Sequence, residues 1–566
     1  MTIGTLLDPE RWRWNPFSRV RPSESELEDP GHDPKAVMYR HPGSPAAAPP
    51  KRVCIIGGGI AGLAAAYELT DGHPHSVAVF EATHRWGGRV LTHYFPDGTY
   101  GELGAMRVPD YHECVWHYVN QFGLDQKRRR FWSYNEDGYC LFRDSGRLRR
   151  FQWDAAGPQL FGVSTGSRPK TAKRMIDEVG LAATINREEV WEGLSNKITS
   201  EHLSLLEAVP LGTFVAGATK ARAKQSLTDQ QWEYAGLTTN HLWLERIALL
   251  HWVREGEIID VGQMHELDGG WDQLIRAFVD RLSRRSNIRL ELGGEVIAVR
   301  AHADAVEVEV RQNDDAVLSE TFDHVICTAP AGATVRIDFE GFDPRSNALP
   351  SKRDALRNLS YASAGKTLMH CSKRFWELDD GIYGGSSVTD RANQQCWYPS
   401  DNAVVDEDSD NAVAVVPFDP TTDRLTTAPQ PATFKARSRD VSESPGVFIA
   451  AYVWEQNARR YASLTDSQRD DLILHAVREL HPTIDTYLVG IEHMPWDAQP
   501  LPGGGAFALF APREQRRYQE AICEPLFAHG LPRVFFAGEH TSVIGGWIQG
   551  ALQTGANSAL DVVEAP

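Results

Sequence analysis

The sequence is poor in cysteine, with seven in 566 residues, and no two of them form a C-x-x-C pair. The absence of such pairs argues against a structural zinc site, and the odd number of cysteines argues against a disulfide framework. Several of the cysteines lie in apolar, strand-like segments, where a thiol packs as a small hydrophobic group. We therefore expect a reduced, cytoplasmic protein without a bound metal.

Long apolar runs and an excess of positive charge are also absent. No window of 18 residues is apolar throughout, and the first residues lack the basic and apolar segments of a signal peptide, so we expect neither a membrane span nor a leader. Lys and Arg number 58 against 76 Asp and Glu, which gives a formal net charge of −18. This charge argues against a nucleic-acid partner and against binding to anionic lipid.

The most specific motif lies near residue 57. An apolar run, Val53–Ile56, has the length and composition of a buried parallel strand, and Gly57, Gly59 and Gly62 follow it in G-x-G-x-x-G spacing. The Ala- and Leu-rich residues 63–69 predict a helix. Gly57 permits the tight turn, Gly59 lets the backbone approach a pyrophosphate, and Gly62 lets helix and strand pack closely.

A second strand and an acid complete this pattern. Val77–Phe80 predicts a buried strand that ends at Glu81, roughly 20 residues after the glycines, where a dinucleotide-binding fold places its acid. Glu81 would accept hydrogen bonds from a ribose hydroxyl. The helix N-terminus would offer free N–H groups to phosphates. These features together predict dinucleotide binding.

A similar strand, turn and helix recur near the other end of the chain. The apolar run Val534–Phe536 is followed by Gly538 and Glu539, then by Gly546, Trp547 and a helical segment. At 566 residues the chain is also too long for one hydrophobic core. We therefore predict an α/β fold with a doubly wound, Rossmann-like domain that is split between the two ends of the sequence.

The intervening sequence contains both helical and strand-like patterns. Residues 175 to about 253 show apolar residues at helical spacing. Strands are expected at 288–290, 296–299, 306–310, 325–328, 367–371 and 446–453. The acidic, then Pro- and Thr-rich segment 404–444 is expected to consist of loops.

Four motifs, in one order, resemble the flavin-dependent amine oxidase superfamily and specifically its L-amino acid oxidase branch, over roughly residues 50–565. They are the glycine fingerprint with Arg85–Arg89 (RWGGR); Glu102–Pro109 (ELGAMRVP); Ala364–Thr367 (AGKT) with Phe375–Glu377 and Gly381–Gly385; and Gly505–Phe510 (GAFALF) with the late glycine motifs.

Residues 1–50 form a Pro-rich and charged extension, and Trp12, Trp14 and Phe17 predict that part of it docks on the body. For the rest, the resemblance implies an FAD-binding domain in three parts (51–95, 263–345 and 501–566), a substrate-binding domain in two parts (96–150 and 346–500) and a helical domain (151–262). It also implies a homodimer.

The resemblance further implies bound FAD. Glu539 would bind a ribityl hydroxyl, Arg89 would neutralise the pyrophosphate, and the backbone of Val296 would meet the adenine. Some amine oxidases tether the flavin through a cysteine beside the late glycines; Ile544–Trp547 contains none, so we expect non-covalent FAD. The residues expected to contact the cofactor are Gly57, Gly59, Ile60, Ala61, Gly62, Glu81, Ala82, Gly88, Arg89, Gly104, Ala105, Met106, Arg107, Val296, Gly538, Glu539, Gly546, Trp547 and Ile548.

The resemblance assigns five residues to the reaction. Arg107 would clamp the substrate carboxylate, and the hydroxyl of Tyr452 would share it. Lys366 would hold a water against the flavin and could assist proton movement. Trp547 would form a wall of the slot around the α-amine, and the carbonyl of Gly546 would accept a hydrogen bond from that amine.

The implied reaction is oxidative deamination of an L-amino acid. A hydride passes from the substrate Cα to FAD, the imino acid hydrolyses to a 2-oxo acid and ammonia, and O₂ reoxidises the flavin with release of H₂O₂. One alternative is an amino acid 2-monooxygenase, which would release an amide and CO₂. A simple amine oxidase fits less well because Arg107 would have no carboxylate to bind. A flavin-binding protein without turnover is the last alternative.

The side-chain pocket is the least defined part of the predicted site. The region around His251 and Glu255 corresponds to a pocket-lining segment of the family, but the register leaves open which residue faces the substrate. Glu255, Glu257 and Glu455, beside Trp454, are candidate acids for a cationic side chain. We expect a basic substrate such as L-arginine, with a broad-range or hydrophobic amino acid oxidase as the alternative.

Overall fold

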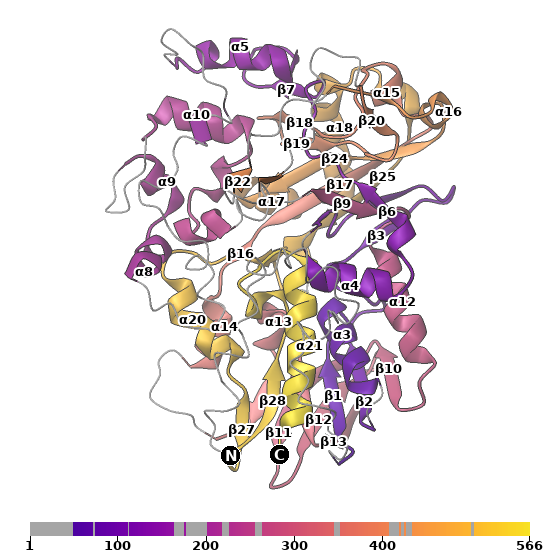
Figure 1. Cartoon of the computed structure of the whole chain (residues 1–566), viewed down its shortest axis with the longest axis vertical. Coiled ribbons are helices and arrows are strands. Elements are labelled where there is room, and N and C mark those ends of the chain that lie inside the picture. The colour runs from indigo at the N-terminus through magenta and orange to yellow at the C-terminus, as the bar shows by residue number, and fades with distance from the viewer. Residues whose placement is uncertain are drawn as a thin grey trace.

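The structure is a computed structural model, and the fold is an elongated assembly of two sheet-based parts with helices along one side (Figure 1). It describes residues 49–71, 74–110, 112–163, 172, 175–176, 201–217, 226–254, 263–343, 351–406, 418–419, 424–425, 433–499 and 503–566. The predicted N-terminal extension therefore lies outside the described residues except for its last two positions. The acids Glu255 and Glu257 also lie outside them.

The lower part in Figure 1 is built on a six-stranded sheet whose strands come from both ends of the chain. In spatial order these are β10 (Ile288–Leu292), β2 (Ser76–Glu81), β1 (Arg52–Ile56), β14 (His324–Cys327), β28 (Leu531–Phe536) and β27 (Leu526–Ala528). All neighbours are parallel except β27 and β28. This arrangement confirms the predicted split α/β fold.

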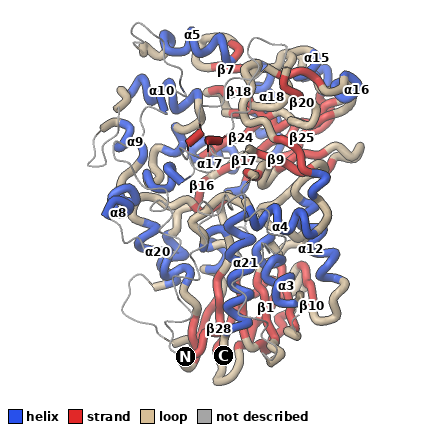
Figure 2. The backbone as a smooth tube through the Cα atoms, viewed as in Figure 1, coloured by secondary structure: helices blue, strands red, loops and turns tan. Residues whose placement is uncertain are grey.

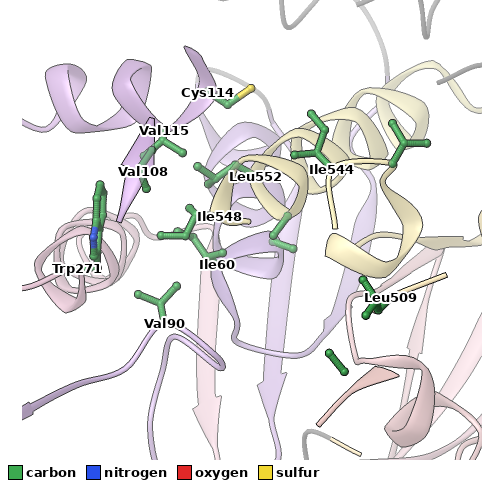
Figure 3. Packing of buried hydrophobic residues seen from close by; sticks show 14 of the residues in the cluster. Ile60, Val90, Val108, Cys114, Val115, Trp271, Leu509, Ile544, Ile548 and Leu552 are labelled. Atoms are coloured by element: carbon green, nitrogen blue, oxygen red, sulfur yellow. The ribbon is translucent and has the colours of Figure 1, made fainter. Parts of the chain in front are cut away.

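Two helices from opposite ends of the chain pack together over this sheet, as Figure 3 shows for Ile60 and Leu552. They are α3 (Ile60–Thr70) and α21 (Ile548–Glu564). A Cβ on Gly555 would lie 2.2 Å from the Ala61 carbonyl oxygen, so only glycine permits this approach. Lys51 Nζ donates to the Val562 carbonyl at the end of α21 (2.7 Å), which holds the two chain ends together.

A smaller four-stranded sheet adjoins the first. Its order is β13 (Val317–Phe322), β12 (Val306–Arg311), β11 (Glu295–Ala301) and β15 (Asp338–Glu340). The alternation of acidic and apolar residues in β12 places its valines in the core and its glutamates at half-exposed positions. Helix α12 (Asp272–Ser283) begins after the glycine pair at 269–270.

The upper part contains a seven-stranded sheet. Its order is β25 (Leu488–Pro495), β17 (Ala364–Cys371), β24 (Gly446–Trp454), β19 (Gln395–Trp397), β18 (Ser386–Thr389), β7 (Tyr139–Leu141) and β8 (Leu148–Arg149). Strands β17 and β24 are antiparallel, and Lys366 is the direct cross-strand partner of Tyr452. Their side chains therefore emerge on one face of the sheet.

Short strand pairs connect the two parts. These are β3 (Thr92–Tyr94) with β4 (Tyr100–Glu102), β16 (Tyr361–Ala362) with β26 (Phe507–Ala508), and a three-stranded ribbon of β5 (Val108–Pro109), β9 (Met264–Leu267) and β6 (Arg128–Arg130). Because β5 follows Arg107 directly, the ribbon fixes the position of that residue.

A group of helices lies on the left of Figure 2, drawn in blue like the other helices. They include α5 (Arg150–Leu160), α8 (Glu201–Ala208), α9 (Leu211–Val215), α10 (Asp229–Thr238) and the 3₁₀ turn Leu242–Leu244. Thr228 caps α10, since its hydroxyl oxygen accepts a hydrogen bond from the Gln231 N–H and its own N–H donates to Gln231 Oε1. Within the described residues, the predicted helical character of 175–253 is therefore observed.

The prediction that 404–444 consists of loops is wrong at both ends of that segment. Val404 and Val405 belong to β20 (Ala403–Val405), which pairs with β23 (Phe434–Ala436), and α16 (Arg439–Ser442) follows. Short strands β21 (Phe418–Asp419) and β22 (Arg424–Leu425) also pair. Two-residue and three-residue strands carry too little periodicity to stand out in a sequence, and their pairing is non-local.

The structure shows the state of the cysteines and the apolar character of the described helices. All seven cysteines lie in the described residues as free thiols, and all but Cys523 are buried. Among the described helices, none combines the length and apolar character that crossing a membrane requires. The described part of the chain also contains no cluster of three or more His, Cys, Asp or Glu side chains suited to a metal ion.

The contact between α3 and α21 should dominate the stability of the lower part. Leu552 is fully buried in this contact, so Leu552→Ala should lower the free energy of unfolding by about 2–5 kcal/mol. Leu472→Ala in α18 (Asp466–Leu480), where the leucine is 39% exposed, is the matched control and should cost less than about 1 kcal/mol. Thermal melting of the two variants checks this, and equal shifts would contradict the assigned role of the helix pair.

Candidate active site

The three fingerprint glycines differ in the space that surrounds each Cα. Gly57 has φ +103°, and a Cβ there would lie 2.7 Å from Thr328 Oγ1. A Cβ on Gly62 would lie 2.0 Å from the Gly57 carbonyl oxygen, which explains why helix and strand need glycine at this contact. A Cβ on Gly59 would meet no protein atom within 4 Å. The glycine at position 59 therefore keeps space open beside the N-terminus of α3, where a phosphate group would bind.

Glu81 lies at the end of β2 beside this open space. Its carboxylate accepts hydrogen bonds from the Gly58 N–H (2.7 Å) and from the N–H of Thr83 (2.8 Å). Its carbonyl accepts the Gly294 N–H (3.0 Å), which brings the start of β11 to the same place. Val296 follows in β11 at a register shift, so the structure brings together in space the two segments that carry the residues predicted for the ribose and the adenine.

The second glycine motif packs directly on the first. The Gly87 N–H donates to the Gly58 carbonyl (2.9 Å), and a Cβ on Gly88 would lie 3.3 Å from the Gly59 Cα. The Ala105 N–H donates to the Arg89 carbonyl (3.2 Å). Three segments that are separate in the sequence, around residues 59, 88 and 105, thus form one continuous surface.

Glu539 links this surface to the C-terminal part of the chain. Its side chain is 6% exposed and forms an ion pair with Arg89 Nη1 (2.6 Å). It also accepts hydrogen bonds from the Ala508 N–H (3.0 Å) and from the Gly546 N–H (3.1 Å). Arg89 also donates to the Ala506 carbonyl (3.1 Å). The sequence assigned Arg89 to a pyrophosphate, whereas here its charge is compensated by Glu539.

Of the residues expected to contact the cofactor, Gly546 is exposed and Trp547 half-buried, and the others are half-buried or buried. Gly57, Gly59, Glu81, Ala82, Gly88, Arg89, Gly104, Ala105 and Arg107 are half-buried, although buried residues flank most of them. Ile60, Ala61, Gly62, Met106, Val296, Gly538, Glu539 and Ile548 are buried around them. A surface rich in glycine and backbone N–H groups, with acids at both ends, fits a dinucleotide such as FAD.

Lys366 is buried at 2% exposure on β17 and points toward the Glu102–Arg107 segment. Its Nζ donates to the Gly104 carbonyl (2.6 Å) and to the Glu102 carbonyl (3.2 Å). Burial lowers the pKa of Lys366 well below its usual range; the Glu102 carboxylate opposes that shift and the Arg107 charge adds to it. The lysine is therefore suited to exchange a proton near neutral pH.

Glu102 is the carboxyl group that faces this lysine. It accepts hydrogen bonds from the Trp271 N–H (2.8 Å) and from the Thr92 hydroxyl (3.0 Å). Burial raises the pKa of Glu102 above its ordinary value, and the Trp271 N–H and the Lys366 charge oppose the rise. Both groups therefore lie in a poorly solvated environment, where the charge of each favours the charged form of the other.

Arg107 lies between aromatic rings at the start of β5. Its guanidinium carbon is 4.8 Å from the ring centroid of Trp397 and 5.7 Å from that of Phe131. The two rings pack against the guanidinium group, and its N–H groups, which lie in the plane of the group, remain the hydrogen-bond donors. This geometry suits a bidentate contact with a carboxylate.

Tyr452 completes the polar part of the site. Lys366 Nζ is 4.7 Å from its ring centroid, and Tyr452 packs with Trp547 and Met494 against the apolar cluster that contains Trp397. The structure therefore brings together Arg107, Lys366, Tyr452 and Trp547, four residues predicted from distant motifs.

Further aromatic residues pack beside Tyr452, next to this apolar cluster. Trp454 lies 4.4 Å from Tyr452 and stacks on Trp243 with a centroid distance of 4.3 Å and an interplanar angle of 9°. Phe507 packs against Trp454 edge-on at 6.0 Å. Trp454 Nε1 is buried without a hydrogen-bond partner among the described residues.

Trp547 and Gly546 lie at the N-terminus of α21. Gly546 has φ +76°, and a Cβ there would lie 3.0 Å from the Phe507 ring, so glycine is required. The Trp547 ring meets His112 edge-to-face at 5.2 Å. Burial lowers the pKa of His112 to about 3, so this histidine is neutral.

Of the three candidate acids for a cationic side chain, Glu455 alone lies among the described residues. Glu455 accepts hydrogen bonds from the Ser363 N–H (3.1 Å) and from Arg459 (3.1 Å), which already compensate its charge. Glu255 and Glu257 lie outside the described residues. His251 is buried near Gly545, and burial lowers its pKa to about 3.

Sequence reasoning missed several residues of this site. Trp397, Phe131 and His112 belong to no recognised motif, and nothing local in the sequence marks them. Phe507 lies in the Gly505–Phe510 motif and Trp243 in the segment predicted to be helical, but neither residue was assigned a role in the site. Their distance in the sequence from Arg107 and Tyr452 hides their role.

Comparison with known proteins agrees with this geometry. Residues 60–563 match the family described as flavin containing amine oxidoreductase. The chain is similar to an L-amino-acid oxidase of Vipera ammodytes ammodytes, 27% identical over 538 residues that cover 91% of this chain and 93% of that protein. An L-amino-acid oxidase of Siganus canaliculatus is 27% identical over 524 residues, covering 90% and 85%.

Solved structures show the same fold. Cyclohexylamine oxidase from Brevibacterium oxydans superposes with a TM-score of 0.60 at 18% identity, covering 91% of this chain and 99% of that one. Wild-type putrescine oxidase bound to putrescine gives a TM-score of 0.55 at 18% identity, again over 91% and 99%. Because the family match covers most of the sequence, this chain belongs to the flavin-containing amine oxidoreductases and is an FAD-dependent oxidoreductase.

Proposed function

We propose that this protein is an FAD-dependent L-amino acid oxidase, which converts an L-amino acid to a 2-oxo acid, ammonia and H₂O₂. The observation that supports this most directly is the position of Arg107 between Trp397 and Phe131, close to Lys366 and Tyr452. The similarity to L-amino-acid oxidases over 91% of the chain supports the same conclusion.

Arg107 is the residue that distinguishes an amino acid from a simple amine. A guanidinium in an aromatic environment is poorly solvated, and a substrate carboxylate would restore its charge compensation with two parallel hydrogen bonds. An amine without a carboxylate would leave the arginine without this partner. Tyr452 is placed to share the carboxylate through its hydroxyl, which fixes the orientation of the substrate.

Lys366 is placed to handle a proton next to the reacting centre. Its Nζ is held by two backbone carbonyls, those of Glu102 and Gly104, and so has a donor position left for a water or a substrate atom. Because burial lowers its pKa, the neutral amine is accessible and can accept a proton. Trp547 and Gly546 would border the α-amine.

When bound, FAD supplies the two-electron oxidation of the substrate and passes the electrons to O₂. The residues that would hold it are the glycine surface around Gly59, with Glu81 at the ribose end and Glu539 with Arg89 near the C-terminal helix. We propose non-covalent binding, because no cysteine lies among Ile544–Trp547. The cytoplasmic location and the homodimer stay predictions.

The side-chain pocket is proposed to prefer a basic substrate such as L-arginine. The aromatic faces of Trp454 and Tyr452 border the polar site, and such faces attract guanidinium and ammonium groups. The same faces also suit large apolar side chains, so a broad-range oxidase is the alternative. The preference rests on these rings, since Glu455 is already bonded to Arg459 and to the Ser363 N–H.

A pair of glycine variants tests the cofactor site. Gly59→Ala should fold normally, since its Cβ meets no protein atom within 4 Å, but should weaken FAD binding by at least about tenfold because the methyl occupies the space left for phosphate. Gly62→Ala should instead reduce the yield of folded protein, because its Cβ would lie 2.0 Å from a carbonyl oxygen. Fluorescence titration of the apoproteins measures FAD binding, and unchanged affinity in Gly59→Ala would refute the assignment.

Replacement of Arg107 tests the carboxylate clamp. Arg107→Gln should lower kcat/KM for L-amino acids by about 100- to 1,000-fold, which corresponds to about 3–4 kcal/mol of lost transition-state binding. Arg284→Gln, at an exposed arginine of α12, is the matched control and should retain the parent activity. Steady-state peroxide assays check this; unchanged turnover of amino acids by the Arg107 variant would sink the proposal.

Anaerobic mixing with each of the twenty L-amino acids tests the substrate class. We expect loss of the oxidised flavin spectrum with L-amino acids and fastest with L-arginine or L-lysine. Aerobic products should be the 2-oxo acid, ammonia and H₂O₂. An amide with CO₂ would instead identify a 2-monooxygenase, and a flavin that no amino acid reduces would identify a binding protein without turnover.

A further inference from the structure

A hollow of about 370 Å³ lies on the substrate-binding side of the molecule, next to the polar site but separate from it. One wall is β6, the run of three arginines Arg128–Arg130, with Trp132 after it. The other wall is formed by β20 and by Arg437, which follows β23 (Figure 1). This volume falls in the range of pockets that hold small molecules.

The hollow is strongly cationic in a chain of formal charge −18. Four arginines line it (Arg128, Arg129, Arg130 and Arg437) against one acid, Asp401. Asp401 is already bound by both terminal nitrogens of Arg374, at 2.6 and 2.7 Å. It also lies 3.9 Å from Arg129 Nη1, so it compensates part of the charge of that arginine, but no ion pair joins it to Arg128, Arg130 or Arg437 among the described residues.

Arg130 is the least compensated of these arginines. It lies with its guanidinium carbon 5.0 Å from the Trp132 ring centroid, and its Nε and Nη1 atoms are buried without a hydrogen-bond partner among the described residues. Burial and the neighbouring Arg128 lower its pKa, and Asp110 opposes the shift. Buried guanidinium N–H groups without an acceptor are costly, so an anionic ligand would relieve them.

Other acids around the hollow do not supply that acceptor. Asp268 is engaged by Arg129. Glu266, on β9 opposite Arg129, has its pKa raised to about 8 by burial and by Asp401, so it carries little negative charge near neutral pH. Asp110 acts on Arg130 only through its field, with no hydrogen bond between them.

We propose that this arginine hollow is a second ligand site, which binds an oxyanion, a phosphate or carboxylate group, through Arg130 with Arg128 and Arg437. The planar forks of arginine match both groups, and the aromatic ring of Trp132 orients the central guanidinium. The site is independent of the proposed oxidase reaction, because it shares no residue with Arg107, Lys366 or Tyr452.

The hollow is nevertheless mechanically connected to the reaction site. Phe131, the residue after Arg130, contacts the guanidinium of Arg107, and β6 and β5 are both paired with β9. An anion that draws Arg130 toward the hollow acts on the same ribbon that positions Arg107. Occupancy is therefore expected to change KM for the amino acid more than kcat.

Phosphate binding to the flavin-loaded, substrate-free protein tests the site. We expect inorganic phosphate to raise the melting temperature saturably and to give a binding isotherm by calorimetry, whereas chloride at equal ionic strength does neither. Arg130→Gln should weaken the phosphate affinity by at least about tenfold, and Arg437→Gln, on the opposite wall, by a smaller factor. Arg284→Gln replaces an exposed arginine that does not line the hollow, and it should leave the phosphate affinity unchanged.

Citrate in a parallel titration distinguishes a carboxylate from a phosphate as the preferred group. Flavin absorbance, recorded for every variant, verifies that the cofactor site is intact. If Arg130→Gln fails to fold, the phosphate affinity of Arg437→Gln, a variant at an exposed residue, is compared with that of the parent protein instead. The proposal is overturned if neither anion binds, or if all four proteins respond equally. Failure of the oxidase proposal would leave these binding results unaffected, because no substrate is present.

Discussion

The architecture of the site depends on one buried carboxylate. Glu539 accepts hydrogen bonds from Arg89, from the Ala508 N–H and from the Gly546 N–H, which belong to three distant segments. A buried charge without these partners would cost several kcal/mol, so the three segments are stable only together. The turn before α21 and the second glycine motif therefore take their positions from the same group.

Sequence reasoning predicted the parts of this arrangement that depend on local pattern. Strands β1 and β2 follow from short apolar runs with glycine and acid at fixed spacing, and their parallel pairing is what that spacing requires. The motifs also identified Lys366 and Tyr452 as members of one site. Their direct cross-strand pairing could not be predicted, because it depends on the register of β17 with β24, which shifts between Thr367 and Leu368.

The remaining differences arise from long-range contacts. Arg89 carries the charge expected for a pyrophosphate partner, but only the fold shows that Glu539 lies 2.6 Å away and shares that charge. Trp397 and Phe131 give no local signal, since a tryptophan or phenylalanine in a strand is ordinarily part of a core. Their function depends on facing the guanidinium of Arg107, which no sequence pattern encodes.

The packing of α3 against α21 has a consequence for how the chain is made. Lys51 and the Val562 carbonyl that it binds are 511 positions apart, and Ala61 meets Gly555 across the same contact. During synthesis the first glycine loop and its helix leave the ribosome long before α21, the helix that buries them. The nascent chain must therefore keep an apolar helix shielded until α21 has been made, a demand typically met by chaperones.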